Sequence, residues 1–134
     1  MKLHHVGYLV ENIDTSYNDI AKTMSVAEKS QTFYDSEQDA FIKFIWQDNS
    51  IEQSCIELVQ PGKNNEALKK LLKKNGDYLY HICYETSSLD TKVEEFVKNG
   101  AIIIKHKKKA IAFNNKEVVF LFIRRGLIIE LVQK

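Results

Sequence analysis

The sequence has almost no net charge and no long hydrophobic segment. Its 134 residues carry a formal net charge of +1 at pH 7, so it lacks the excess of one sign that favours a polyanionic partner. No apolar run approaches the ~20 residues that span a bilayer, and the first residues, MKLHHVGYLVENID, lack the pattern of a secretory signal. We therefore expect a cytoplasmic protein that binds neither a membrane nor nucleic acid.

Cysteine is also scarce. The two cysteines, Cys55 and Cys83, each lie in an apolar run of strand character. They do not form the closely spaced doublets of metal or redox sites, so we expect buried, reduced thiols. The 44% hydrophobic residues are typical of a globular protein. A chain of this length is close to the commonest domain size, and we predict one domain over residues 1–134.

The chain contains an internal repeat. A shift of 76 positions aligns HVGYLVENIDTSYNDIAK, which starts at His5, with HICYETSSLDTKVEEFVK, which starts at His81. The segment IELVQ occurs at 56–60 and again at 129–133, a shift of 73. Chance explains two matches in the same order poorly, and a repeat must be recognised before elements are assigned. The pattern indicates two divergent copies of one module.

Each copy is expected to contain a strand, a helix and three further strands. The opening strands are rich in aromatic and β-branched residues, and apolar residues then recur at helical spacing. The expected strands are 3–10, 31–35, 39–47 and 54–60 in the first copy, and 78–86, 101–105, 116–124 and 127–133 in the second, with helices that begin near residues 13 and 89.

The sequence therefore predicts an α+β fold of two βαβββ modules related by a pseudo-twofold axis. Module one covers residues 1–62 and module two covers residues 77–134. Between them, Leu68, Leu71 and Leu72 share one face of a linking helix within residues 63–76. We expect the two modules to enclose a metal-containing cavity between curved mixed β-sheets.

Each module places one histidine near the start of its first strand and one glutamate in its last strand. The pairs are His5 with Glu57, and His81 with Glu130. Any one of them alone is more often a structural residue. A pseudo-twofold axis, however, brings equivalent residues together from opposite sides. Two imidazoles and two carboxylates suit Zn²⁺, Ni²⁺, Co²⁺, Mn²⁺ or Fe²⁺ and leave positions open for substrate oxygens. We predict one divalent metal ion at these four residues.

The segments HHVGYLV, IELVQP, YHICYET and LIIELVQ resemble the signature segments of the vicinal oxygen chelate superfamily. Its members include glyoxalase I, methylmalonyl-CoA epimerase, extradiol dioxygenases and bleomycin-resistance proteins. The resemblance covers nearly the whole chain, and IELVQPGKNNEALKKLLKKNGDYLYHICYE is most similar to the epimerase-like branch. It implies that His5, Glu57, His81 and Glu130 bind the metal and that Glu130 is a candidate base. Epimerases of this branch usually carry a His-Pro-Lys segment before the last strand, where this chain reads FLFIRRG.

The resemblance implies a metal-dependent isomerase or epimerase that acts through a metal-stabilised enolate. Its substrate would be a small acyl thioester or similar carbonyl compound, with thioesters of coenzyme A and of glutathione as the candidates, and the resemblance allows a homodimer. Glu57 and Glu130 come from opposite modules, so either could take the proton. A glyoxalase I-like lactoylglutathione lyase and a metal-free binding protein of the bleomycin-resistance kind are the alternatives. An extradiol dioxygenase needs two histidines and only one carboxylate, which would leave Glu57 surplus.

Some neighbouring residues are weaker candidates. In a regular strand, His4 would point to the face opposite His5 and serve in packing or at the surface, with a contact to a metal ligand as the alternative. Gly7, Leu9 and Cys83 share the expected cavity face with the two histidines, although core packing explains them equally well. The run KHKKK at 105–109, which includes His106, is typical of a solvated charged turn. Together with the lysines of the linking helix, this run could attract the phosphates of coenzyme A.

Overall fold

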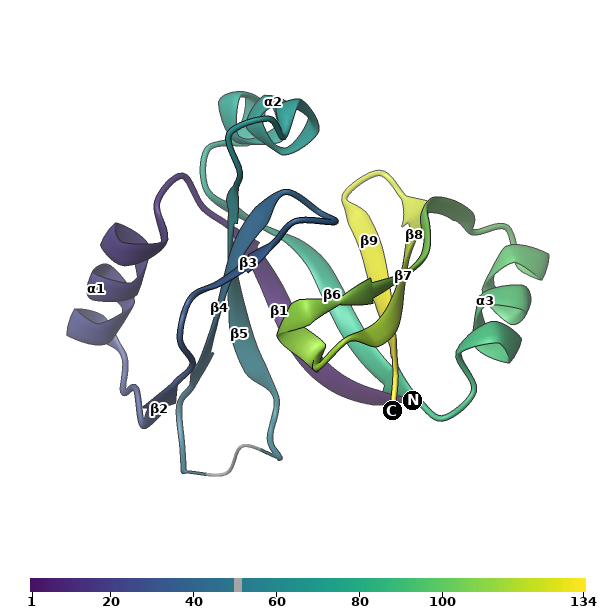
Figure 1. The fold of residues 1–134 in the computed structure, drawn as a ribbon, viewed down its shortest axis with the longest axis horizontal. Coiled ribbons are helices and arrows are strands. Elements are labelled where there is room, and N and C mark those ends of the chain that lie inside the picture. Colours follow the sequence, from purple (N-terminus) through teal and green to yellow (C-terminus); the bar gives the residue numbers. More distant parts are fainter. Residues whose placement is uncertain (50–51) are drawn as a thin grey trace.

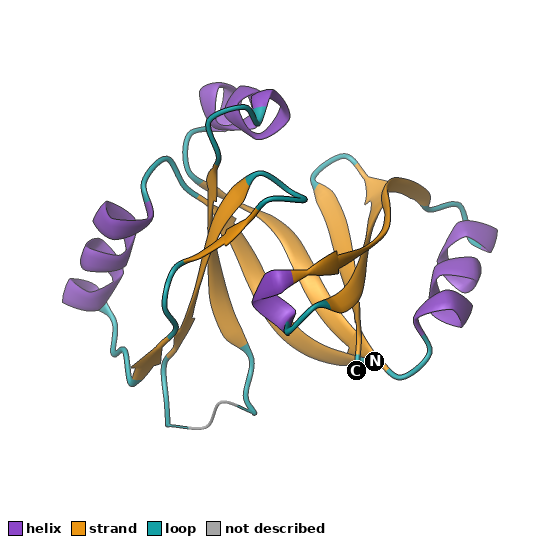
Figure 2. Cartoon of the chain, in the orientation of Figure 1, coloured by secondary structure: helices purple, strands orange, loops and turns teal. Residues whose placement is uncertain are grey.

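A computed structural model of the protein describes residues 1–49 and 52–134. This part of the chain forms one curved, mixed nine-stranded sheet with three α-helices (Figure 1; Figure 2). The first half contains β1 (Lys2–Leu9), α1 (Ile13–Thr23), β2 (Glu28–Lys29), β3 (Phe33–Asp35), β4 (Ala40–Trp46) and β5 (Cys55–Pro61). After α2 (Glu66–Asn75), the second half contains β6 (Tyr78–Thr86), α3 (Leu89–Lys98), β7 (Ile102–Ala110), a 3₁₀ turn (Ile111–Phe113), β8 (Lys116–Arg124) and β9 (Leu127–Gln133).

The strand order is the same in the two halves when it is read outward from the centre. The full order is β2-β4-β5-β1-β6-β9-β8-β7, and β3 also pairs with β4. The opening strands β1 and β6 are antiparallel at the centre, and each is parallel to the last strand of its own half. This symmetric order confirms the predicted βαβββ architecture. The division at residues 62 and 77 stays a prediction.

The glutamine that ends each IELVQ segment positions the helix of its half. Gln60 Oε1 accepts a hydrogen bond from the backbone N–H of Ile13 at 2.9 Å, and Gln133 Oε1 accepts one from Leu89 at 3.1 Å. Both donors are first residues of helices, whose N–H groups have no partner within the helix. The repeated glutamine therefore ties the start of α1 to β5 and the start of α3 to β9.

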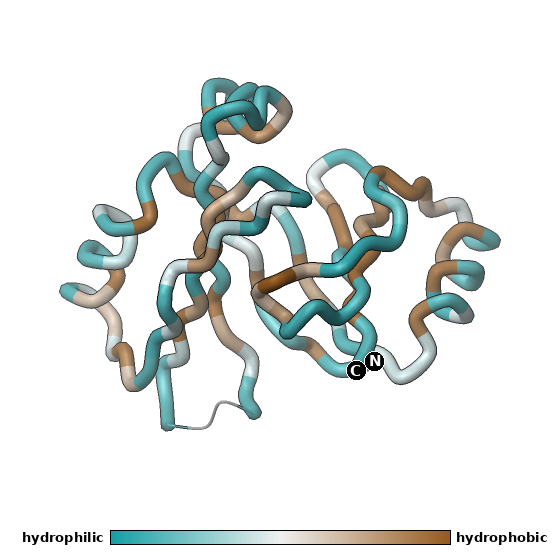
Figure 3. The backbone as a smooth tube through the Cα atoms, viewed as in Figure 1, coloured by the Kyte–Doolittle hydropathy of each residue, from teal (hydrophilic) through white to brown (hydrophobic). Residues whose placement is uncertain are grey.

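The sheet has two apolar faces. On the outer face, α1 packs on Ile45 and Leu58, and α3 packs on Leu121 and Leu131. The helices flank the sheet at its two sides, and hydrophobic stretches follow its strands (Figure 1; Figure 3). The inner, concave face carries a separate cluster of buried aromatic and aliphatic side chains. No helix in the described ranges is long and apolar enough to cross a membrane.

Strand β7 differs from the prediction. It extends from Ile102 to Ala110, so the KHKKK run is part of a strand that pairs with β8 and is not a charged turn. Its register shifts twice against β8, once on each side of Lys105. Such bulges break the simple alternation of strand side chains. This is why the run shows no strand pattern in the sequence.

Candidate metal centre

The structure brings the four predicted ligand residues together on the concave face. His5, Glu57, His81 and Glu130 are all buried, and one ligand atom from each lies within 4.8 Å of the others. The two Nε2 atoms of His5 and His81 are 2.9 Å apart. Glu130 Oε2 lies 3.2 Å from each of these nitrogens, and Glu57 lies 3.2 Å from His5 Nε2 and 3.6 Å from His81 Nε2.

The register of the sheet explains this convergence. In one row across the strands, Phe44, Glu57, Gly7 and His81 are successive partners. In the other, the successive partners are Phe120, Glu130, Cys83 and His5. Residues paired across neighbouring strands point to the same face. The pseudo-twofold axis between β1 and β6 thus places both rows on one side of the sheet.

The spacing and chemistry of the cluster fit one divalent ion. Ligand atoms about 2.1 Å from an ion lie about 3.0 Å apart at a right angle and about 3.4 Å apart at a tetrahedral angle. The measured separations of 2.9–3.6 Å span these values. Glu130 Oε2 is buried and has no hydrogen-bond partner among the described residues, although both imidazoles are near. A buried carboxylate oxygen is costly without a counter-charge, which a cation would supply.

The two carboxylates differ in their electrostatic surroundings. Burial, together with the charge of Glu130, raises the pKa of Glu57. Burial also acts to raise the pKa of Glu130, but the adjacent His5 and His81 side chains outweigh it and hold this pKa below its usual range. Burial lowers the pKa of His5 to about 4. His5 is therefore neutral near pH 7, as a metal-binding imidazole must be.

Gly7 makes room for the His81 ring. A Cβ atom at Gly7 would lie 2.0–2.5 Å from three atoms of this ring. Such distances are far below van der Waals contact, so any larger residue must displace the ring. At the pseudo-equivalent position beside His5, the second half has Cys83.

Replacing Gly7 by alanine should therefore weaken metal binding more than it destabilises the fold. The displaced His81 ring should lower the affinity for Zn²⁺ by at least about 10–100-fold, the effect typical of misorienting a ligand. The overpacking itself should cost about 1–3 kcal/mol of unfolding free energy. Calorimetric titration with Zn²⁺ and urea unfolding of the metal-free protein measure the two effects separately. An unchanged Zn²⁺ affinity would show that metal binding does not depend on the present position of the His81 ring.

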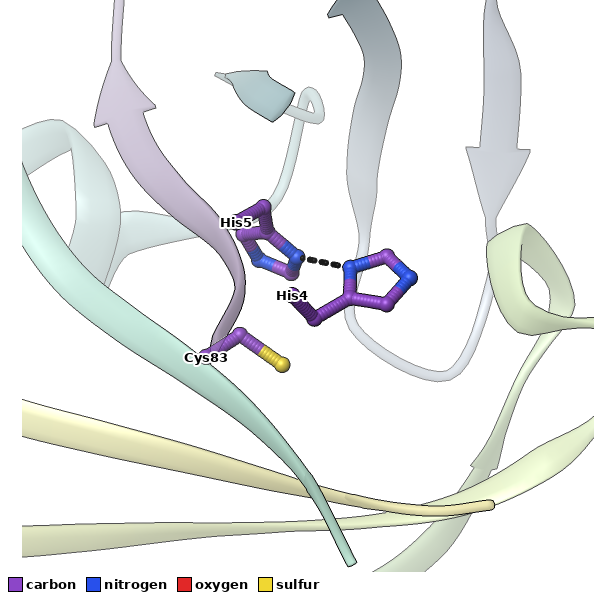
Figure 4. Close-up of side chains that lie close together, drawn as sticks. All are labelled: His4, His5 and Cys83. Carbon is purple, nitrogen blue, oxygen red and sulfur yellow. Dashed lines mark hydrogen bonds between the residues drawn. The ribbon is translucent and has the colours of Figure 1, made fainter. Parts of the chain in front are cut away.

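His4 lies beside His5 and not on the opposite face, in contrast to the prediction. Leu3 pairs with Tyr84 and His5 pairs with Cys83, so His4 is the extra residue of a bulge in β1. The bulge turns its side chain toward the site, where His4 Nδ1 lies 2.9 Å from His5 Nδ1 (Figure 4). For Nε2 of His5 to face an ion, its proton must be on Nδ1, which then donates to His4.

A second bulge lies at the pseudo-equivalent place in β6. There Tyr80 is the extra residue, and its ring packs edge-on against His81 at 4.4 Å between centroids. His81 Nδ1 has no hydrogen-bond partner among the described residues. The histidine of the first half is thus oriented by a hydrogen bond, and that of the second half by ring packing.

His4→Phe should weaken Zn²⁺ binding by about 10–100-fold, because an outer partner that orients a ligand typically has this effect. The phenyl ring preserves the edge contacts of His4 with Phe44 and Phe113 but removes the acceptor for His5. Tyr80→Phe is the matched control, and its Zn²⁺ affinity should be unchanged. If the two variants bind Zn²⁺ equally well, the hydrogen bond to His5 does not orient this ligand.

Sequence reasoning missed the aromatic walls of the site. The Phe44 ring lies 5.7 Å from the His5 ring, and the Phe120 ring lies 5.5 Å from the His81 ring. These phenylalanines are 76 positions apart, so the repeat itself could have identified them. Phe113 stacks on His5 as well. The rings exclude water from the cluster, which strengthens its electrostatic interactions.

A cavity of about 570 Å³ lies on the far side of two rings that pack on His81. Tyr80 and Phe120, which both pack on the His81 ring, form part of its wall. The start of α2 and the segment before β4 contribute the opposite wall. The volume is suited to a small-molecule ligand.

Comparisons with known proteins agree with this architecture. The family model of the Glyoxalase/Bleomycin resistance protein/Dioxygenase superfamily matches residues 3–120, so the chain belongs to this superfamily. The predicted relation to vicinal oxygen chelate proteins is thereby confirmed. A comparison with curated proteins finds no match.

Several solved structures have the same fold. Methylmalonyl-CoA epimerase from Mycobacterium tuberculosis is 20% identical, with a TM-score of 0.83 over 98% of this chain and 87% of that chain. A variant of Streptomyces coelicolor methylmalonyl-CoA epimerase in complex with 2-nitronate-propionyl-CoA is also 20% identical, with a TM-score of 0.82 over 100% and 97% of the two chains. A hypothetical protein from Bacillus halodurans C-125 is 24% identical, with a TM-score of 0.78 over 99% and 94%.

Proposed function

We propose that this protein is a divalent-metal-dependent isomerase that moves a proton at the carbon next to a carbonyl group. The observation that carries the proposal is the buried cluster of His5, Glu57, His81 and Glu130 beside a cavity of about 570 Å³. We infer that these four residues hold one Zn²⁺, Ni²⁺, Co²⁺, Mn²⁺ or Fe²⁺ ion. We further propose that the protein is cytoplasmic, and the family resemblance makes a homodimer the assembly to test.

When bound, the ion would supply the positive charge that stabilises an enolate oxygen. In this mechanism Glu130, which the family resemblance makes the candidate base, accepts the proton from the substrate carbon, and its carboxylate reaches the cluster from β9. Glu57 faces it from β5 and is the second candidate base. The surrounding phenylalanines would keep competing water away from the reacting carbon.

The structural neighbours support a small acyl thioester as the substrate. Two of them are methylmalonyl-CoA epimerases with acyl-CoA compounds bound, namely 2-nitronate-propionyl-CoA and methylmalonyl-CoA. Methylmalonyl-CoA is therefore the first compound to test. We propose the epimerase-like reaction, in which the proton returns to the same carbon from the other face.

The concave face of β4 favours a second candidate reaction. Its buried side chains there are Ile42 and Phe44, which carry no proton-accepting group. Glu130 or Glu57 would then have to return the proton to the substrate. Return by the same carboxylate to a neighbouring carbon is the glyoxalase I-like reaction on a thiol hemithioacetal.

Metal content and proton exchange together test the proposal. Protein purified without chelators should contain about one divalent ion per chain, as one four-ligand cluster requires. In deuterated water it should incorporate deuterium into methylmalonyl-CoA or, separately, into the hemithioacetal of methylglyoxal and glutathione. Chelator treatment should abolish the exchange, and added metal should restore it. A protein that neither takes up metal nor catalyses exchange is not an isomerase of this type.

A further inference from the structure

Two cavities are each lined by rings that pack on one histidine of the metal centre. Tyr80 and Phe120 line the larger cavity of about 570 Å³, whereas His4 and Phe44 line a smaller one of about 310 Å³. These residues are equivalent in pairs, because His4 and Tyr80 are 76 positions apart, as are Phe44 and Phe120. The pseudo-twofold axis thus relates the two hollows, each of which is lined by residues of both halves.

Two lysines break this symmetry. In β7, Lys105 pairs with Phe120 and Lys108 pairs with Val118, and both lysines line the larger cavity. In the first half, Ser30 bonds to the backbone of Phe44, and Phe33 pairs with Ile42. Ser30 and Phe33 line the smaller cavity in the corresponding places. At these positions the larger cavity has two ammonium groups where its counterpart has a hydroxyl group and a phenyl ring, and the one lysine that lines the smaller cavity, Lys116, lies at another position.

The bulges of β7 turn these two lysines inward. Lys105 and Lys108 are partly buried, whereas His106, Lys107 and Lys109 on the same strand are exposed. Lys105 Nζ lies 5.2 Å from the centroid of the Phe120 ring, and the backbone of Phe120 pairs with Glu130. Two strand spacings, about 9–10 Å, thus separate the backbones of Lys105 and Glu130. Both side chains project from the same face of the sheet.

Neither of these two lysines forms an ion pair with a residue that the structure describes. Among the described residues, the lysines that form ion pairs are Lys69, Lys92 and Lys107. The Lys108 ammonium donates to the backbone oxygen of Glu37, at 3.3 Å. Burial and the neighbouring Lys108 lower the pKa of Lys105, and the charges of Glu130 and Asp35 offset this only in part.

The acidic residues that line the cavity are Glu37, Asp39 and Glu66, and Glu66 forms an ion pair with Lys69. Asp39 accepts hydrogen bonds from the Tyr34 hydroxyl and from the backbone N–H of Asn64. Asp35 accepts from the backbone of Glu37 and from Gln38. Two partly buried ammonium groups without a carboxylate partner are costly to the fold, and an anionic ligand would offset that cost.

We propose that Lys105 and Lys108 bind an anionic oxygen group of the substrate, a carboxylate or a phosphate, in the larger cavity. The proposal rests on the proposed function for the reacting end of the substrate, which lies at the metal centre. It adds a substrate class: a carbonyl compound with a second, negatively charged group within about 10 Å of the reacting carbon. The symmetry-breaking lysines thereby determine which of the two cavities receives the substrate.

Anion titrations of the Lys105→Met and Lys108→Met variants test this subsite. Malonate and inorganic phosphate are the two probes, titrated separately into the Zn²⁺-loaded and the metal-free protein by calorimetry. Each variant should bind the preferred anion about 10–100-fold more weakly, because charge-assisted hydrogen bonds are lost. Tighter binding of malonate identifies a carboxylate group, and tighter binding of phosphate identifies a phosphate group. Lys105→Arg, which keeps the charge, should retain most of the affinity.

Lys109→Met is the matched control, because Lys109 lies on the same strand but faces solvent, and its anion affinity should equal that of the wild type. Equal affinity in the wild type and both cavity variants would overturn the proposal, as would a wild type that binds neither anion. If Lys105→Met binds the anion normally but loses proton exchange, Lys105 carries a proton in the reaction and does not bind an anion, and the proposal is wrong. Lysine-dependent anion binding by a chain that takes up no metal would refute the proposed function alone.

Discussion

A Glu130→Gln protein should keep much of its metal and lose most of its turnover. The glutamine amide has the same shape and still offers an oxygen at the position of Oε1 or Oε2, but it cannot accept a proton near neutral pH. General-base assistance typically contributes ~10²–10⁴ in rate, so turnover should fall by at least this factor. Solvent-deuterium incorporation into an accepted substrate measures the proton transfer directly, and metal analysis of the same sample gives the occupancy.

Two further variants test whether the loss of exchange is specific to Glu130. Glu57→Gln changes the pseudo-equivalent carboxylate and should reduce exchange less if Glu130 is the base. Glu117→Gln alters a half-exposed glutamate on the outer part of the sheet, near Lys107, and should leave exchange unchanged. Exchange at the wild-type rate in metal-loaded Glu130→Gln would exclude Glu130 as the base and leave Glu57 in this role.

The sequence was sufficient to predict the fold because each copy of the repeat has recognisable residues of the candidate site at its start and at its end. His5 and His81 are retained at the start of the two copies, and IELVQ at the end of each copy supplies the glutamate of the cluster. The terminal glutamine of the same segment anchors the helix of its half. Since strands of one module must pair in a fixed register, these two short matches determine the topology and the convergence of the four residues.

Bulges account for what the sequence did not reveal. In a regular strand, alternation would place the His4 side chain on the face opposite His5. The bulge in the pairing of β1 with β6 instead turns His4 toward His5. The same holds for Lys105 and Lys108, which are partly buried because β7 shifts twice against β8. A bulge depends on which strand lies alongside and on how the residues of the two strands pair. The residue pattern of one strand therefore does not predict it.

His81→Ala should show the largest loss of metal binding in this protein. The substitution removes one of four ligand atoms that lie within 4.8 Å of one another, and it leaves Glu130 Oε2 with one imidazole fewer. The loss of Zn²⁺ affinity should exceed the about 10–100-fold that is typical of an outer partner such as His4. His106→Ala, which alters an exposed histidine on β7, is the control and should bind Zn²⁺ like the wild type.

Thermal unfolding with and without Zn²⁺ provides a readout of this loss that does not depend on catalysis. An ion that binds only the folded chain stabilises it by about 2.7 kcal/mol when its free concentration is 100 times the dissociation constant. The wild type and His106→Ala should therefore melt at a higher temperature when Zn²⁺ is added, whereas His81→Ala should show little change. The metal-free forms separate this effect from lost packing, because the Tyr80 and Phe120 rings both contact His81 and its removal should itself lower the melting temperature. A Zn²⁺-induced stabilisation of His81→Ala as large as that of the wild type would place the ion away from this cluster.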